Sequence, residues 1–136
     1  MDAAAAAQFL RTNHWAVLAT FRNDGRPAMS PVTAVVDDQD RVLVSTRDTA
    51  MKVQHLRRDP RVTLTAFTER FFGDWVQVEG SAEIVELPDA MDLLVDYYRS
   101  VGGEHPDWDD YRAAMQRERR VIVRFEIERA GPNVSG

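Results

Sequence analysis

The sequence of 136 residues contains no cysteine and only one lysine. Without cysteine there is no disulfide framework, no thiolate metal site and no cysteine nucleophile. The single lysine, Lys52, stands among 17 basic residues that are otherwise all arginine, which marks that position for attention. Long apolar runs are also missing, because the five alanines at 3–7 are too short to span a membrane and no basic residue precedes them as in a secretory signal. We therefore expect a cytoplasmic protein that does not act at a membrane.

The sequence also has fewer basic than acidic residues. The formal net charge is −5, which argues against a nucleic-acid binder, because such proteins neutralise many phosphates. His14, His55 and His105 lie far apart without the spacing of a metal site. No glycine-rich phosphate loop and no nucleophile-elbow serine occurs. The sequence predicts no metal ligand and no catalytic side chain, an absence that is informative if the chemistry belongs to a bound cofactor.

The patterns that are present alternate between strand and helix and fit one domain, 1–130, followed by a frayed tail, 131–136. Period-two patterns predict strands at 14–21, 27–36, 41–46, 61–67, 72–86 and 120–127. Helical patterns lie at 3–11, 49–58, 88–99 and 108–117. A small sheet with long strands tends to close and so protect its edges. We therefore expect an α+β fold, a six-stranded, mainly antiparallel β-barrel with flanking helices.

The segment from Ser45 to Lys52 is the strongest candidate for a binding site. If Thr49 caps the predicted helix at 49–58, Lys52 is its third residue, and a cation there costs about 0.3–1 kcal/mol against the helix dipole. A bound phosphate would reverse that sign, since the free N–H groups, the hydroxyls, Arg47 and Lys52 would all face it. The alternative is an exposed Asp48–Lys52 pair worth about 0.3 kcal/mol. Spacing alone leaves both open.

Further segments occur in an order that is fairly specific in combination, although none is diagnostic alone. They are FL at 9–10, WAVLAT at 15–20, GRP at 25–27, MSPV at 29–32, VLVST at 42–46, LRRDPRV at 56–62 and VEGSA at 78–82. Together with Lys52 they resemble the pyridoxamine 5′-phosphate oxidase-like split-barrel superfamily over roughly residues 8–128. Within it, the chain is most similar to the deazaflavin-dependent reductases of actinobacteria, which use coenzyme F420.

The resemblance implies a homodimer with two cofactor sites at the subunit interface, each built from both chains. The residues that it assigns to the phosphate are Ser45, Thr46 and Lys52, with Thr49 and Ala50 as backbone donors. The strand that it places against the cofactor ring carries Met29, Ser30, Pro31, Val32 and Thr33. Trp75 and Gln77 would reach the cofactor from the opposite subunit.

The chemistry of two of these residues bears on the assignment. Trp75 lies on the polar face of its strand, where a large aromatic side chain needs a partner: a second subunit, a flat ligand or a neighbouring loop. Pro31 cannot donate to a sheet ladder and marks either an edge strand or a place where something else approaches. Tyr97, Tyr98, Tyr111 and Trp108 are expected to pack in the core, with a substrate mouth as the alternative.

The function that the resemblance implies is hydride transfer from reduced F420 to an unsaturated or conjugated organic small molecule. One alternative keeps the fold and uses FMN as the cofactor. Another is a non-catalytic protein that binds a cofactor or a haem-like ligand. Oxidation of pyridoxamine phosphate itself is not expected, because the basic substrate-binding residues of those enzymes are missing towards the C-terminus, apart from Arg120 and Arg124.

Overall fold

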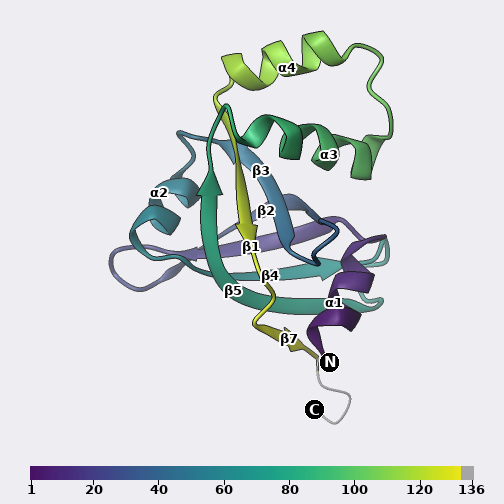
Figure 1. Ribbon diagram of the computed structural model, residues 1–136. Coiled ribbons are helices and arrows are strands. Elements are labelled where there is room, and N and C mark those ends of the chain that lie inside the picture. The colour runs from purple at the N-terminus through teal and green to yellow at the C-terminus, as the bar shows by residue number, and fades with distance from the viewer. Residues whose placement is uncertain (133–136) are drawn as a thin grey trace.

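The structure, a computed structural model, describes residues 1–132 of the chain. Its strands are β1 (Trp15–Phe21), β2 (Pro27–Val36), β3 (Val42–Arg47), β4 (Arg61–Phe67), β5 (Trp75–Val85), β6 (Arg120–Phe125) and β7 (Arg129–Gly131). Its helices are α1 (Ala3–Leu10), α2 (Met51–Arg58), α3 (Ala90–Gly102) and α4 (Trp108–Arg117). Figure 1 shows the strands curving around one another, with the pair α3 and α4 on one side and α1 on the opposite side.

Six antiparallel strands form a closed barrel in the order β4-β1-β2-β3-β6-β5, and β4 pairs with β5 to complete it. Two long strands make the closure possible. β2 pairs with β1 as far as Thr33 and with β3 from Ala34 onwards. β5 pairs with β4 up to Ser81 and with β6 from Ala82. The predicted α+β split barrel with flanking helices is confirmed.

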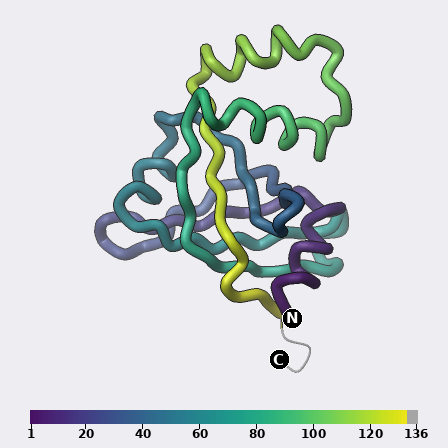
Figure 2. Tube along the Cα trace, in the orientation of Figure 1, coloured from purple at the N-terminus to yellow at the C-terminus, as the bar shows by residue number. Residues whose placement is uncertain are grey.

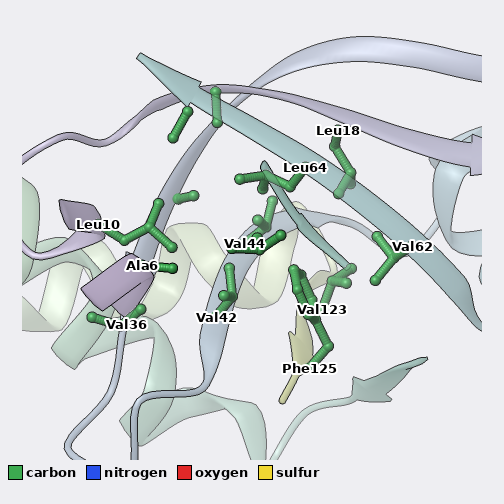
Figure 3. Packing of buried hydrophobic residues seen from close by; sticks show 14 of the residues in the cluster. Ala6, Leu10, Leu18, Val36, Val42, Val44, Val62, Leu64, Val123 and Phe125 are labelled. Atoms are coloured by element: carbon green, nitrogen blue, oxygen red, sulfur yellow. The ribbon is translucent and has the colours of Figure 1, made fainter. Parts of the chain in front are cut away.

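The barrel interior is filled by the inward side chains of alternating strand positions. Figure 3 shows Leu18, Val44, Leu64 and Phe125 converging in this core, which α1 closes with Leu10. Gly80 of β5 belongs to the same layer, and a Cβ there would lie 2.3 Å from the Glu126 carbonyl oxygen. The strand therefore approaches the chain after β6 more closely than any residue larger than glycine allows.

A second apolar cluster lies outside the barrel. The α3–α4 hairpin, visible as the upper pair of helices in Figure 2, packs on the outer face of β2, β3 and β6. Its buried Leu94 and Tyr111 meet Val35, Leu43 and Ile122, the outward residues of those strands. The outer face of β1, β2, β4 and β5 is different, because Trp15, Met29 and Trp75 remain 62%, 67% and 44% exposed there.

Two predicted helix starts are wrong by one or two residues. The N-cap of α2 is Ala50, not Thr49, because the Ala50 N–H closes a turn onto the Arg47 carbonyl at 3.0 Å. Lys52 is therefore the second helical residue. Likewise α3 starts at Ala90, after a turn at 87–89 that includes Pro88, and Gly103 ends it with a φ of 73°.

The prediction missed strand β7 and is wrong at the start of the tail. Gly131, expected to begin a frayed segment, is the last residue of β7 and pairs with Gln77 of β5. The Glu128 N–H donates to the Glu79 carbonyl at 2.9 Å and leads the chain into this pairing. The rest of the predicted tail, at 133–136, lies outside the described residues.

Candidate cofactor site

The start of α2 can bind an anion. No side chain caps the helix, and Ala50 occupies the N-cap position. The N–H groups of Met51 and Lys52 therefore lack the partner that a capping side chain would have supplied, whereas the Val53 N–H donates to the Ala50 carbonyl at 3.1 Å. These groups and the positive end of the helix dipole favour a bound anion. Ala50 itself is not a free donor, because its N–H is already bonded to Arg47.

Lys52, on the first turn of α2, is a half-buried cation without a carboxylate partner among the described residues. Burial lowers the pKa of its ammonium group, and the positive charge of Arg120 lowers it further. The Asp48–Lys52 pair is not formed, because the Asp48 carboxylate binds Arg57 at 2.5 Å and Arg119 at 3.3 Å. The environment of Lys52 thus lacks negative charge, which a bound phosphate would supply.

Positive charge gathers where β3 and β6 end side by side. Arg47 and Arg120 are paired across the two strands, so their side chains lie on the same face. Both bind one carboxylate oxygen, Glu118 Oε1, with Arg47 Nη2 at 3.2 Å and Arg120 Nη2 at 3.0 Å. The hydrogen bonds from Arg120 and Arg47 lower the pKa of Glu118. One carboxylate therefore compensates two guanidinium groups, and Lys52 adds a third cation nearby.

A cavity of about 560 Å³ lies between the barrel wall and the α3–α4 hairpin. From the barrel it is lined by Trp15, Ala16, Pro31, Val32, Thr33, Ser45 and Arg120, and from the hairpin by Tyr97, Tyr98, Tyr111 and Met115. Its volume is in the range of pockets that hold a ligand of drug size. Four of the predicted cofactor residues, Pro31 to Thr33 and Ser45, therefore share one cavity.

Two of the tyrosines have fixed hydroxyl groups. Tyr97 donates to the Thr33 carbonyl and Tyr111 to the Leu94 carbonyl, each at 2.7 Å. Burial raises the pKa of both, that of Tyr111 to about 12, so both are protonated at neutral pH. Tyr111 is buried in the second apolar cluster, and Tyr97, Tyr98 and Trp108 pack against that cluster, as expected. The three tyrosines also line the cavity.

Strand alternation separates several of the predicted residues. Met29, Pro31 and Thr33 point outwards, whereas Ser30 and Val32 alternate with them and lie half-buried on the interior side. In β3, Ser45 faces the cavity while Thr46 is 6% exposed and faces the barrel interior. Arg47 is exposed and bound to Glu118, and Thr49 lies exposed in the turn before α2. Thr46 therefore does not present its hydroxyl on the side of Ser45.

Trp75 and Gln77 lie away from this cavity. They belong to β5, which is separated from β2 by β1 and β4. The pairing registers line up Thr33, Trp15, Phe67 and Trp75 in one row across this face, and Pro31, Val17, Thr65 and Gln77 in the next. Three strand spacings amount to about 14 Å. Within one chain, these two side chains do not reach the cavity at β2.

Glu118 and Arg120 are not among the site residues predicted from the sequence. Arg120 was considered only as a remnant of a different substrate site. The signal that was available is the alternation of β6, which places Arg120 and Arg124 on one face. What no local pattern gives is that β6 pairs with β3, so that Arg120 lies opposite Arg47.

The arrangement fits a ligand that joins a phosphate to a flat ring. The uncapped start of α2 carries Lys52, which lies near Arg120, and Arg120 lines the cavity with aromatic walls. The family model of pyridoxamine 5′-phosphate oxidase matches residues 3–132. The chain belongs to this family.

Solved structures agree with this assignment. A conserved hypothetical protein of Mycobacterium tuberculosis, Rv2991, is 30% identical, with 96% of this chain and 82% of that protein covered and a TM-score of 0.78. An F420 reductase shares 19% identity over 91% and 94% of the two chains, with a TM-score of 0.71. A heme binding protein from Mycobacterium smegmatis shares 19% identity over 96% of this chain and 53% of its own, with a TM-score of 0.68. The last two show the fold alone.

No helix between residues 1 and 132 is long and apolar enough to cross a membrane. Within the same residues, no three histidine, aspartate or glutamate side chains gather in a way that could hold a metal ion.

Proposed function

We propose that the protein is an F420-dependent oxidoreductase that transfers a hydride between reduced deazaflavin and an unsaturated or conjugated organic small molecule. The observation that carries this proposal is Lys52, a half-buried cation without a carboxylate partner in the described part of the chain, beside the uncapped start of α2. The Ser45 and Arg120 side of this region opens into an aromatic cavity, which suits a phosphate joined to a ring system.

In this proposal the Lys52 ammonium group, the N–H groups of Met51 and Lys52 and the Ser45 hydroxyl hold the phosphate. The outward side of β2, with Pro31 and Thr33, supports the ring. When bound, the deazaflavin supplies the hydride. The remaining contribution of the chain is to orient the ring and to exclude water, which the α3–α4 hairpin does by covering one side of the cavity.

We further propose that the protein is a homodimer in which Trp75 and Gln77 of one subunit complete the site of the other. Within one chain these residues lie three strands away from β2, so only a second copy can bring them there. The face that carries them also carries Trp15 and Met29, whose exposed apolar side chains would be covered by the same contact.

Titration of the purified protein with F420 and with FMN tests the cofactor. Tighter binding of F420 than of FMN, in the micromolar range or better, is the expected result. A protein that is yellow as purified and binds FMN more tightly would contradict F420 as the cofactor and support the FMN alternative.

Stopped-flow mixing of the protein and reduced F420 with quinones, enones and tetrapyrroles tests catalysis. Binding of reduced F420 that none of these acceptors oxidises would indicate a carrier and not an enzyme.

A further inference from the structure

We infer that the side of the cavity next to the α3–α4 hairpin, opposite the β2 residues that support the cofactor ring, takes a planar conjugated acid, whose anionic group binds the guanidinium of Arg120. The statement that this acid is the substrate rests on the proposed function. Binding of the acid does not depend on that function, because it follows from the residues that line the cavity. The substrate class proposed above, an unsaturated or conjugated organic small molecule, is thereby narrowed to planar acids.

The lining of the cavity carries a positive charge and no negative one. Arg120 is its only charged residue among the described residues that line it, and no aspartate or glutamate contributes to the wall. The chain as a whole has a net charge of −5. A cavity of opposite sign on an acidic protein attracts anions and disfavours cations.

Arg120 is held in place but has binding capacity to spare. Its Nε and Nη2 atoms donate to a single oxygen, Glu118 Oε1, at 3.2 and 3.0 Å. Nη1 has no partner among the described residues. A guanidinium group offers five N–H donors in a planar fork that suits a carboxylate. The ion pair with Glu118 thus orients Arg120 without using up its donors.

The charge of Arg120 is also only partly compensated. Glu118 is shared with Arg47, so one negative charge serves two guanidinium groups. Lys52 adds another positive charge that acts on Arg120 from the α2 side. Two uncompensated positive charges are therefore present, and a cofactor phosphate at α2 and an acid in the cavity would each meet one of them.

The remaining lining favours a flat, conjugated ligand. Trp15, Tyr97 and Tyr98 give aromatic surfaces on which a ring can stack. The Tyr97 hydroxyl donates to the Thr33 carbonyl, which holds its ring in place. Arg120 is therefore the strongest hydrogen-bond donor that the described lining offers to the anionic group of such a ligand.

The test is calorimetric titration of the full chain, without cofactor, with 2-naphthoate and with 2-naphthamide, two probes of equal ring size that differ in charge. We expect naphthoate to bind at least tenfold more tightly than the amide, and Arg120→Gln to remove this preference. Arg120→Lys keeps the charge and should retain part of it. The matched control is Arg124→Gln, on the same face of β6 but bound to Glu83 at 2.7 Å, away from the cavity.

Circular dichroism of each variant shows whether it is folded. If Arg120→Gln does not fold, a smaller preference for the acid in Arg120→Lys than in the wild type tests the inference instead. Equal binding of acid and amide by the wild type would overturn the inference. A loss of F420 affinity in Arg120→Gln as large as in Lys52→Met would overturn it too, because Arg120 would then belong to the cofactor site. If the acid preference holds but F420 does not bind, the acid site is supported and the proposed function fails.

Discussion

Lys52 at the start of α2 and Arg120 at the start of β6 lie close enough for the charge of Arg120 to lower the pKa of Lys52. Two cations are thus held together, one of them half-buried and without a carboxylate partner in the described residues. Such an arrangement is unfavourable in the free protein and favourable once an anion is bound. It is the physical reason for treating this end of the barrel as a binding site.

The first prediction concerns the free protein. Lys52→Met should leave the unfolding free energy unchanged or raise it by about 0.3–1 kcal/mol, because it removes a cation from the positive end of a helix dipole. Inorganic phosphate should raise the melting temperature of the wild type, since a ligand that binds only the folded state stabilises it. Lys52→Met should lose this gain, whereas Arg112→Met on the exposed side of α4 should keep it. Calorimetric scans in phosphate and in chloride at equal ionic strength measure both effects.

The pH dependence of the same group follows from the direction of its shift. Because the pKa of Lys52 is lowered in the folded state, the unfolded chain binds more protons between that value and the usual 10.5. The contribution of Lys52 to stability therefore improves as the pH rises through this window. Stability curves of wild type and Lys52→Met should converge towards pH 10. A difference that widens instead would show that Lys52 has a stabilising partner.

Asp48 supplies a second prediction. Its carboxylate binds Arg57 and Arg119, and these interactions lower its pKa below 3.8. A carboxylate with a lowered pKa stabilises the fold above its unfolded pKa and loses that effect as the pH falls. Asp48→Asn should therefore lower the melting temperature at pH 7, and the difference from wild type should shrink below about pH 4. The exposed Asp38→Asn is the control, and a difference that does not depend on pH would contradict the assignment.

The spacing from Ser45 to Lys52 left an anion site and an Asp48–Lys52 pair equally open, and the structure removes the pair, because Asp48 binds Arg57 and Arg119. The details of the anion site were less accessible. Ala50 was expected to donate to the anion, but its N–H closes the turn onto Arg47. Thr46 was grouped with Ser45, although strand alternation, a rule available from sequence, places the two on opposite faces. The contacts of Glu118 with Arg47 and Arg120 depend on the pairing of β3 with β6, which no local pattern encodes.

The barrel itself was more predictable than its closure. The alternating pattern predicted the six strands to within a few residues. Because β2 and β5 are long, the first half of each pairs with one neighbour and the second half with another: β2 with β1 and β3, and β5 with β4 and β6. The short strand β7 was missed, because three residues are too few for a periodic signal and their pairing partner lies in β5. The α3 and α4 patterns were recognised, but their packing on the outer face of β3 is a tertiary contact.

Gly80 gives a prediction about packing. A Cβ at this position would lie 2.8 Å from the Phe125 ring as well as close to the Glu126 carbonyl. Gly80→Ala should destabilise the fold by about 1–3 kcal/mol, as overpacking does in cores. Gly25→Asn is the comparison, because Gly25 has open space and a φ of 85° that asparagine tolerates, and it should change stability by less than about 0.5 kcal/mol. Urea unfolding distinguishes the two, and equal effects would contradict the close approach.

The proposed dimer predicts complementation between two defective variants. Lys52→Met and Trp75→Ala should each bind F420 weakly. In a mixed dimer, one site would combine the intact Lys52 of one subunit with the intact Trp75 of the other. Denaturing the two variants together and refolding them should therefore restore strong binding in about a quarter of all sites. No recovery, with dimers confirmed by ultracentrifugation, would show that Trp75 does not act across the interface.

A substitution on the outer face of β1, β2, β4 and β5 tests whether this face forms the proposed dimer interface. Thr65 lies half-buried between Val17 and Gln77 in the row of outward side chains. Thr65→Arg should shift the protein towards the monomer, because a charge in the centre of such a contact is left unpaired. Ala113→Arg on the exposed side of α4 should leave the oligomeric state unchanged. A Thr65→Arg protein with the sedimentation coefficient of the wild type would place the interface elsewhere.

The most direct measurement is the affinity of F420 for the wild type and for Lys52→Met, by fluorescence titration under identical conditions. Hydrogen bonds to charged groups contribute about 1.5–3 kcal/mol, so the variant should bind about tenfold to a hundredfold more weakly. Arg112→Met should bind as the wild type does. Equal affinity of the wild type and Lys52→Met would contradict the assignment of the phosphate to the start of α2.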